Sequence, residues 1–328
     1  MYRPLVILFY KLMAFVLSFA TSVGLITVPD AQTPLTVDET AELTFAVFGD
    51  CQVSNVMYAR ELSFYAACED LGNTRGVLDA LVIVGDIAEN GLQSEYATVR
   101  DILNQNSNAF NAFLAVEGNH DVRSRVYSLQ MKRFCDFVNS VDKSVPLPEG
   151  KYNYTYDING YRFIVLGTDS TQFEESELSE AQLIWLDEQI AETQASGRPV
   201  FVFAHQPLQN THGLPGTWNA PEFLKAGSIG AQNDEVKAIF EKYDNVIFIS
   251  GHLHTGVGEY TYEDYGAFKS FNVPGVSMKN ADGIQNNGQG LVFSVYNDKI
   301  VMRARIFGEG RYVDESVTNA LVEIPLGE

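Results

Sequence analysis

The stretch Gly118-Asn119-His120-Asp121 closes the apolar run Ala112–Glu117, which has the length and composition of a buried strand. A carboxamide, an imidazole and a carboxylate therefore follow the carboxyl end of a strand, where open α/β sheets bind their ligands. Taken alone, these four residues are explained equally well as a polar turn. The decisive feature is repetition, because similar apolar runs end at Asp50, Asp86, His205, His252 and His254.

The spacing of the first three of these sites predicts βαβ units. Three apolar runs alternate with two stretches of helical periodicity, in the order Leu43–Phe48, Val56–Leu71, Leu81–Val84, Ser94–Gln105 and Ala112–Glu117. Asp50, Asp86 and Asn119 are separated by 36 and 33 residues, which matches βαβ units of roughly 30 residues. Right-handed crossovers place the three strand ends on one rim, so these side chains are expected to converge.

The rest of the chain changes from alternating helices and strands to mostly strands. Helices are predicted over Ser124–Ser140, Ser179–Ala195 and Asp234–Tyr243. Strands are predicted over Tyr152–Ile158, Tyr161–Leu166, Pro199–Ala204, Val246–Ser250, Phe268–Val273, Leu291–Tyr296 and Ile300–Ile306. Asn159-Gly160 predicts a two-residue hairpin turn, and Ser179 predicts a helix N-cap. The pattern indicates an α/β protein with two sheets packed face to face and helices outside.

Composition sets limits on partners. The 328 residues are 46% apolar and 12% aromatic, which suits a globular protein with a sizeable core. We expect one domain over residues 40–328, because no repeat or linker divides them. The net charge of −20 repels nucleic-acid polymers and anionic lipid. A small anionic substrate is still compatible if bound cations dominate the local field.

Residues 1–31 are expected to be separate from the fold. Arg3 and Lys11 precede Leu12–Val28, an uncharged apolar run followed by small residues, which is typical of an export signal. The protein is therefore expected to be secreted, periplasmic or on the cell surface. The run is barely long enough to span a bilayer, so an uncleaved anchor is the alternative and the one expected contact with a membrane.

The three cysteines predict no disulfide framework. One bridge plus a free thiol is compatible with Cys51, Cys68 and Cys135, and the sequence leaves the pairing open. Cys51 adjoins Asp50, but sulfur suits softer ions than the carboxylates around it. Cys51 is therefore interpreted as a packed thiol.

The residues at the strand ends form a mixed oxygen and nitrogen ligand set, which suits divalent or trivalent first-row ions. His252 and His254 are one residue apart, so their rings point the same way in an extended segment. Asp86, which lies between the other groups in chain order, is the predicted bridging carboxylate. Two ions roughly 3.5–4 Å apart clamp a phosphoryl group and generate a hydroxide. His120 is the predicted proton donor, with Asp121 orienting its ring.

These motifs resemble, in order, the five motifs of the calcineurin-like metallophosphoesterases. They are Gly49-Asp50, Gly85-Asp86-Ile87-Ala88-Glu89-Asn90-Gly91, Gly118-Asn119-His120-Asp121, His205 and Gly251-His252-Leu253-His254. The resemblance covers about residues 44–256. It implies a four-layer α/β/β/α sandwich of two mixed β-sheets, as in metallo-dependent phosphatases. It also implies a site for two ions, of which Mn, Fe or Zn are expected.

The resemblance also implies the roles of individual residues. One ion would be held by Asp50, Asp86 and His254. The other ion would be held by four residues, namely Asp86, Asn119, His205 and His252. His120 would assist departure of the leaving group.

This chain departs from the family in its first motif, which usually reads Asp-x-His but here is Asp50-Cys51-Gln52. Gln52 offers a neutral amide oxygen in place of an imidazole nitrogen. This favours oxygen-preferring ions such as Mn²⁺ at that position, or leaves a water where the ring would lie. Gln52 is predicted either to bind the ion or to hydrogen-bond one of its ligands.

Three residues are candidates for substrate binding. Arg123 could grip a phosphate, although a surface arginine at a helix start is the simpler interpretation. His212 and Trp218 lie in a long loop rich in Gly, Pro and Asn, and could form a lid or stack on a base. A tryptophan that pins the loop to the core is the alternative.

The sequence thus predicts a metal-dependent hydrolase of small phosphate esters, either a phosphomonoesterase or a phosphodiesterase. The alternative is a non-catalytic metal- or ligand-binding module on the same fold. The presence of both Asn119 and His120 argues against it, because such a module has no need of a proton donor. Hydrolysis of another bond, such as an amide, is compatible with the ligands but not favoured by the motifs.

Overall fold

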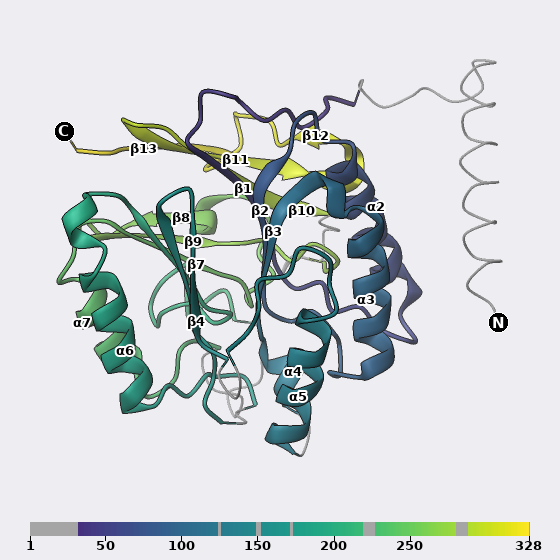
Figure 1. The fold of residues 1–328 in the computed structure, drawn as a ribbon, viewed down its shortest axis with the longest axis horizontal. Helices are drawn as coiled ribbons and strands as arrows, with labels where there is room; N and C mark the ends of the chain where they lie inside the picture. The colour runs from purple at the N-terminus through teal and green to yellow at the C-terminus, as the bar shows by residue number, and fades with distance from the viewer. Residues whose placement is uncertain are drawn as a thin grey trace. The chain divides into compact units, whose positions relative to one another are not determined.

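The computed structural model describes residues 32–123, 126–148, 152–170, 173–218, 227–279 and 288–327 (Figure 1). The predicted export signal over residues 1–31 lies outside these ranges and stays a prediction. Among the described residues, no helix combines the length and the apolar character needed to cross a bilayer.

The first half of the fold alternates strands and helices in the predicted order. The elements are β1 (Leu43–Phe48), α2 (Tyr58–Gly72), β2 (Leu78–Val84), α3 (Gln93–Gln105), β3 (Phe110–Val116), α4 (Asn119–Val122) and α5 (Tyr127–Val138). Their bounds differ from the predicted ones by a few residues at most, as expected where helix and strand ends fray. The short helix α4 was not predicted, because four residues carry no periodicity.

The second half adds two helices and most of the strands. The elements are β4 (Tyr154–Ile158), β5 (Tyr161–Val165), α6 (Glu180–Ala191), β6 (Val200–Phe203), α7 (Asn233–Phe240), β7 (Val246–Ser250), β8 (Tyr262–Asp264), β9 (Phe268–Asn272), β10 (Gln289–Val295), β11 (Lys299–Ile306), β12 (Arg311–Tyr312) and β13 (Leu321–Pro325). The predicted turn is confirmed, since Asn159 and Gly160 both have positive φ, at 52° and 84°. The Ser179 side chain accepts a hydrogen bond from the Gln182 amide and caps α6 as predicted.

Over the described residues, the strands form two mixed sheets. The seven-stranded sheet has the order β12-β11-β10-β1-β2-β3, with β13 paired to β11. The six-stranded sheet has the order β4-β5-β6-β7-β9-β8. Helices α2, α3 and α5 flank the first sheet and α6 and α7 the second (Figure 1). The predicted arrangement of two sheets with helices outside is confirmed.

The two sheets share one core, and the strands alternate between it and the helices. On β1, Phe45 and Val47 face the other sheet, whereas Phe48 faces the helices. The Phe45 ring stacks on Phe293 at 4.9 Å and meets the edge of Phe201 at 5.0 Å. Burial of each such ring contributes about 1.5–3 kcal/mol. This core fixes the strands whose ends carry the polar motifs.

Strand direction brings the motif residues to one edge of each sheet. β1 pairs in parallel with β2, and β2 with β3, so Asp50, Asp86 and Asn119 follow adjacent carboxyl ends. β6 and β7 are also parallel, and His205 and His252 follow their carboxyl ends. The sequence motifs therefore converge because parallel pairing aligns the strand ends.

None of the three cysteines is paired, and all three lie in the described part of the chain. Cys51 is fully buried, and burial holds the pKa of its thiol well above the usual range. A buried, protonated thiol beside Asp50 agrees with the prediction of a packed side chain rather than a ligand.

Candidate metal centre

Five of the predicted ligand residues have left-handed backbone conformations, which residues other than glycine rarely adopt. The φ angles are 49° at Asp50, 38° at Gln52, 51° at Asp86, 73° at His252 and 53° at His254. Each such residue costs about 1–3 kcal/mol and persists only where its surroundings impose it, most often at functional sites. The tight turns at these strand ends are therefore built at a cost to stability.

The ligand atoms of the predicted metal residues meet in two groups. We call Asp50, Asp86 and His254 the carboxylate-rich triplet, and Asp86, His205 and His252 the histidine-rich triplet. Within each triplet, one potential ligand atom from every residue lies within 4.8 Å of the others. Asp86 belongs to both triplets, so one carboxylate connects two adjacent positions that could hold a metal ion.

His205 lies at the centre of the histidine-rich triplet. Its Nδ1 is 2.8 Å from the Val84 carbonyl, to which it donates as Nδ1–H, so Nε2 is the nitrogen left to bind an ion once it has released its proton. His205 Nε2 is 3.4 Å from Asp86 Oδ1 and 3.1 Å from His252 Nδ1. The Asn119 Oδ1 atom is also 3.1 Å from this nitrogen. Four candidate ligand atoms thus face one another.

These separations fit a shared cation. Two ligands that each lie about 2.0–2.1 Å from one ion are themselves about 3 Å apart. His205 Nε2 and His252 Nδ1 have this separation, as do His254 Nε2 and Asp50 Oδ1, at 3.0 Å. The buried Gln52 Oε1 atom has no hydrogen-bond partner among the described residues, so a neutral oxygen is available as well.

The electrostatics also favour positive charge. Burial raises the pKa of the Asp86 carboxyl, but His205 and His120 outweigh burial and hold this pKa well below its usual range. Burial lowers the pKa of His205, but Asp86 and Asp50 outweigh it and raise this pKa to about 10. Burial and the charge of His205 hold the pKa of His252 well below its usual range. A proton on His205 therefore occupies the place of a cation.

Close approach in the motifs depends on two glycines. A Cβ atom on Gly118 would lie 2.2 Å from Asp86 Oδ1, so only glycine fits there. Gly85 has a φ of +87°, and a Cβ atom on it would lie 2.4 Å from His205 Nδ1.

Gln52 contacts the Asp86 carboxylate, since its Nε2 donates to Asp86 Oδ2 at 3.0 Å. Gln52 therefore contacts a ligand, and its own binding to an ion stays a prediction.

His120 lies beside the shared carboxylate. Its main-chain amide donates to Asp86 Oδ1 at 2.8 Å, and its ring Nε2 is 3.8 Å from Asp86 Oδ2. Its Nδ1 is 2.9 Å from the main-chain carbonyl of Glu89. With Nδ1–H donated to this carbonyl, Nε2 is the ring nitrogen available to a substrate.

The prediction that Asp121 orients the His120 ring is wrong. The Asp121 carboxylate accepts hydrogen bonds from the amides of Ile87, Ala88 and Gly118 at 2.9–3.1 Å, and from the Tyr96 hydroxyl at 2.9 Å. Helix α4 turns this side chain inward, where it ties the loop after β2 to the loop after β3. Burial and the charge of Asp86 raise its pKa to about 6.

Asn119 is held by two residues that the sequence did not indicate. Its Nδ2 donates to Glu174 Oε2 at 2.8 Å and to the Phe173 carbonyl at 3.3 Å. These bonds turn Asn119 Oδ1 towards His205. Glu174 and Phe173 lie in the loop between β5 and α6, which has no motif, so only the tertiary structure identifies them.

The three predicted substrate-binding residues have different environments. Arg123 lies near the centre, with its guanidinium 5.7 Å from the centroid of the Phe173 ring and 4.0 Å from Glu89 Oε1. Its predicted contact with phosphate stays a prediction.

The prediction that His212 contacts the substrate is wrong, because its side chain is buried. Both ring nitrogens are hydrogen-bonded, one to the Tyr260 carbonyl at 2.8 Å and the other to Ser270 Oγ at 2.7 Å.

Trp218 packs on a metal ligand. Its ring stacks on the His252 ring with a centroid distance of 4.5 Å and an interplanar angle of 24°. A Cβ atom on Gly227 would lie 2.6 Å from the same indole, so Gly227 packs closely against the Trp218 ring. This packing supports the alternative interpretation, in which Trp218 holds its part of the loop against the protein, and the predicted stacking of Trp218 on a base stays a prediction.

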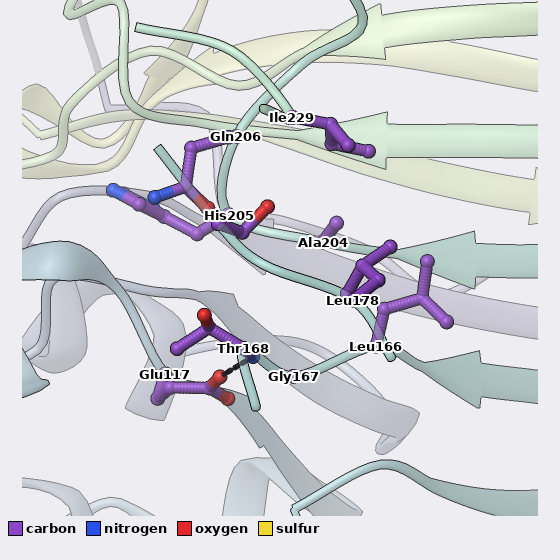
Figure 2. Close-up of a pocket in the computed structure, with 10 residues that line it drawn as sticks. Glu117, Leu166, Gly167, Thr168, Leu178, Ala204, His205, Gln206 and Ile229 are labelled. Atoms are coloured by element: carbon purple, nitrogen blue, oxygen red, sulfur yellow. Dashed lines mark hydrogen bonds between the residues drawn. The ribbon is translucent and has the colours of Figure 1, made fainter. Parts of the chain in front are cut away.

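A small cavity adjoins His205 but is not the metal centre. It has a volume of about 10 Å³, enough for about one water molecule. Figure 2 shows His205 and Gln206 on one side and Glu117, bonded to the Thr168 amide, on the other. Glu117 is buried, which raises its pKa to about 8, and its Oε2 has no hydrogen-bond partner among the described residues. An ordered water would satisfy this oxygen.

Comparisons with known proteins agree with this geometry. The sequence profile of the calcineurin-like phosphoesterases matches residues 43–256, which is more than half of the chain. A cAMP/cGMP dual specificity phosphodiesterase of Mycobacterium tuberculosis (strain CDC 1551 / Oshkosh) is 27% identical over 177 residues. This alignment covers 54% of the present chain and 48% of the phosphodiesterase, so it spans about half of that relative's length.

Two solved structures share the fold. A dimetal phosphatase from Danio rerio has a TM-score of 0.62 at 15% identity, covering 88% of this chain and all of its own. A purple acid phosphatase from yellow lupin (Lupinus luteus) seeds has a TM-score of 0.55 at 14% identity, covering 83% of this chain and 52% of its own. At these identities the likeness shows the fold alone. The predicted fold class is confirmed.

Proposed function

Because the chain belongs to the calcineurin-like phosphoesterase family, we propose that it hydrolyses small phosphate esters with the help of two metal ions. The carboxylate-rich triplet would hold one ion, and the histidine-rich triplet with Asn119 would hold the other. The observation that carries the proposal is that Asp86 belongs to both triplets. The mixed oxygen and nitrogen donors suit Mn, Fe or Zn.

The protein supplies the positions and the charge for this reaction. When bound, the two ions would activate a water and neutralise the negative charge of the phosphoryl oxygens. Val84 and Glu174 hold His205 and Asn119 in their orientations, so the ligand atoms need little rearrangement on binding.

His120 is the proposed proton donor. One P–O bond forms as water attacks, the ester P–O bond breaks, and the leaving oxygen takes a proton from His120 Nε2. The proton released by the water passes to solvent, and His120 is protonated again from there. The Glu89 carbonyl supports this role, because it fixes Nδ1 and leaves Nε2 facing the Asp86 side of the centre.

The proposal covers monoesters and diesters, because both reactions use the same ligands. The similar protein from Mycobacterium tuberculosis is a cAMP/cGMP phosphodiesterase, which makes cyclic nucleotides the first diesters to test. The net charge of −20 argues for small substrates over nucleic-acid polymers.

The test is turnover of phosphomonoesters, simple diesters and cyclic nucleotides by protein loaded with Mn²⁺, compared with the His120→Ala variant. We expect turnover by the wild type and a loss of about 10²–10⁴-fold in the variant, with metal content near that of the wild type. His120→Asn serves as a control for the loss of ring volume and polarity.

Two results would contradict the proposal. Loss of the ions in His120→Ala would make His120 a ligand and remove it from the proton-donor role. No turnover of any ester by metal-loaded wild type would favour the non-catalytic binding module instead.

A further inference from the structure

Phe173 is an exposed aromatic side chain whose backbone is fixed to the metal centre. The residue is 55% exposed, and its carbonyl accepts a hydrogen bond from Asn119 Nδ2 at 3.3 Å. The next residue, Glu174, accepts from the same nitrogen at 2.8 Å. A single exposed apolar side chain is ordinary on a protein surface. The backbone that carries this exposed ring is therefore anchored to a candidate metal ligand.

Arg123 places this ring on the His120 side of the centre. Arg123 caps the C-terminus of α4 and follows His120 by three residues, so the two side chains share a face of the helix. The Arg123 guanidinium lies 5.7 Å from the centroid of the Phe173 ring, within the range of a cation–π contact. The Phe173 ring therefore lies on the side where the leaving group would be protonated.

The charge of Arg123 is balanced by Glu89, whose carboxylate is 4.0 Å away. This side of the centre thus offers an aromatic ring beside the paired charges of Arg123 and Glu89.

We propose that Phe173 forms a subsite for an aromatic ring in the leaving group of the substrate. The substrate class would then be phosphate esters that carry an aryl group or a nucleobase close to the scissile bond. This inference rests on the proposed function for its orientation. A flat ring suits the site because it can stack on the Phe173 face that the Arg123 guanidinium does not cover.

The test separates ring recognition from hydrolysis by measuring binding. The probes are benzylphosphonate and cyclohexylmethylphosphonate, which have the same phosphonate group and similar size but differ in aromaticity, and neither can be hydrolysed. Titration calorimetry with Mn²⁺-loaded protein gives the ratio of the two dissociation constants. We expect the wild type to favour benzylphosphonate by about three- to tenfold, the range of an aromatic pair.

Substitutions at Phe173 should change this ratio selectively. Phe173→Leu keeps apolar bulk but removes the ring, and the ratio should fall to about one. Phe173→Tyr should retain the preference. Tyr156→Leu, which removes another exposed aromatic ring on β4, is the matched control and should leave the ratio unchanged.

Three outcomes would overturn the inference: no aromatic preference in the wild type, an unchanged ratio in Phe173→Leu, or a preference for the cyclohexyl probe, which would indicate an aliphatic leaving group. A protein that shows the expected binding ratios but hydrolyses no ester would contradict the proposed function alone. A protein that hydrolyses esters but lacks the ratios would contradict this inference alone.

Discussion

The two halves of the candidate metal centre differ in charge and in burial. The carboxylate-rich triplet has two carboxylates and one imidazole, and the His254 side chain is 25% exposed. The histidine-rich triplet has one carboxylate and two imidazoles, and the side chains of His205 and Asp86 are 0% and 1% exposed. Trp218 covers the His252 ring in this second half.

In the proposed function, this difference would give the two ion positions separate chemistry. The oxygen-rich position beside the partly exposed His254 would favour an oxygen-preferring ion such as Mn²⁺. A buried position with two imidazoles favours ions that prefer nitrogen and releases them slowly. Asp86 is the exception, because it serves both halves and is held from several sides.

The largest expected effect comes from removing the Asp86 carboxylate, which both triplets share. Asp86→Asn should remove both ions and lower turnover by roughly 10³-fold or more, since each ion supplies several kcal/mol of charge stabilisation. Metal analysis by mass spectrometry and turnover of a responsive ester measure the effect. Asp157→Asn, at an exposed position of β4, is the control and should keep both ions. Retention of two ions by Asp86→Asn would mean that the halves are independent.

Protons should compete with the ion of the histidine-rich half. His205 in the metal-free protein has a pKa raised to about 10, so it is protonated at neutral pH and must release this proton to bind an ion. Metal affinity of the histidine-rich half should therefore fall about tenfold for each pH unit below about 10. Calorimetry in buffers with different ionisation enthalpies should show about one proton released per ion.

The raised pKa of His205 also determines how the stability of the metal-free protein changes with pH. A raised histidine pKa stabilises the metal-free protein below its unfolded pKa of about 6.5, and this contribution is lost as the pH rises towards about 10. Metal-loaded protein should lack this dependence. Ion binding without proton release at pH 7 would contradict the assignment of His205 as a ligand.

Gln52→His should alter the metal preference of the carboxylate-rich half. An added imidazole shifts this position towards nitrogen-preferring ions, so Zn²⁺ should gain relative to Mn²⁺ while turnover stays within about tenfold of the wild type. Competition between Mn²⁺ and Zn²⁺ measures the change, and Gln52→Asn controls for loss of the bond to Asp86. Unchanged metal preference would place residue 52 outside direct contact with the ion.

The smallest expected effect comes from removing the Trp218 ring, which stacks on His252 in the histidine-rich half. Trp218→Ala removes the ring stacked on His252 and should weaken binding of that ion by about two- to tenfold, as expected for one aromatic pair. Trp218→Phe should keep most of the affinity. Equal weakening of both ions, or equal effects of the two substitutions, would show that the loop acts on the whole centre rather than on one ligand.

The sequence predicted those parts of the centre that follow from strand geometry. Apolar runs that end in Asp50, Asp86 and Asn119 converge because parallel strands align their ends, and that rule needs no tertiary detail. The chemistry of the ligand set could likewise be deduced from residue type. The helices and strands around the centre were predicted from the spacing of their apolar residues.

The sequence could not predict the contacts that depend on helix phase or on main-chain atoms. Asp121 is next to His120 in the chain, yet α4 turns its carboxylate towards Tyr96. The carbonyl that orients His120 belongs to the main chain of Glu89, and a carbonyl has no sequence pattern. His212 lies in a long loop, as many site residues do, but its two buried hydrogen bonds depend on residues that are distant in the sequence.

Anomalous diffraction from crystals grown with Mn²⁺ tests the central idea most directly. We expect two anomalous peaks about 3.5–4 Å apart. One peak should lie in bonding reach of Asp50 and His254, the other of His205 and His252, and both should contact Asp86. A single peak, or two peaks that do not share Asp86, would contradict a two-ion centre.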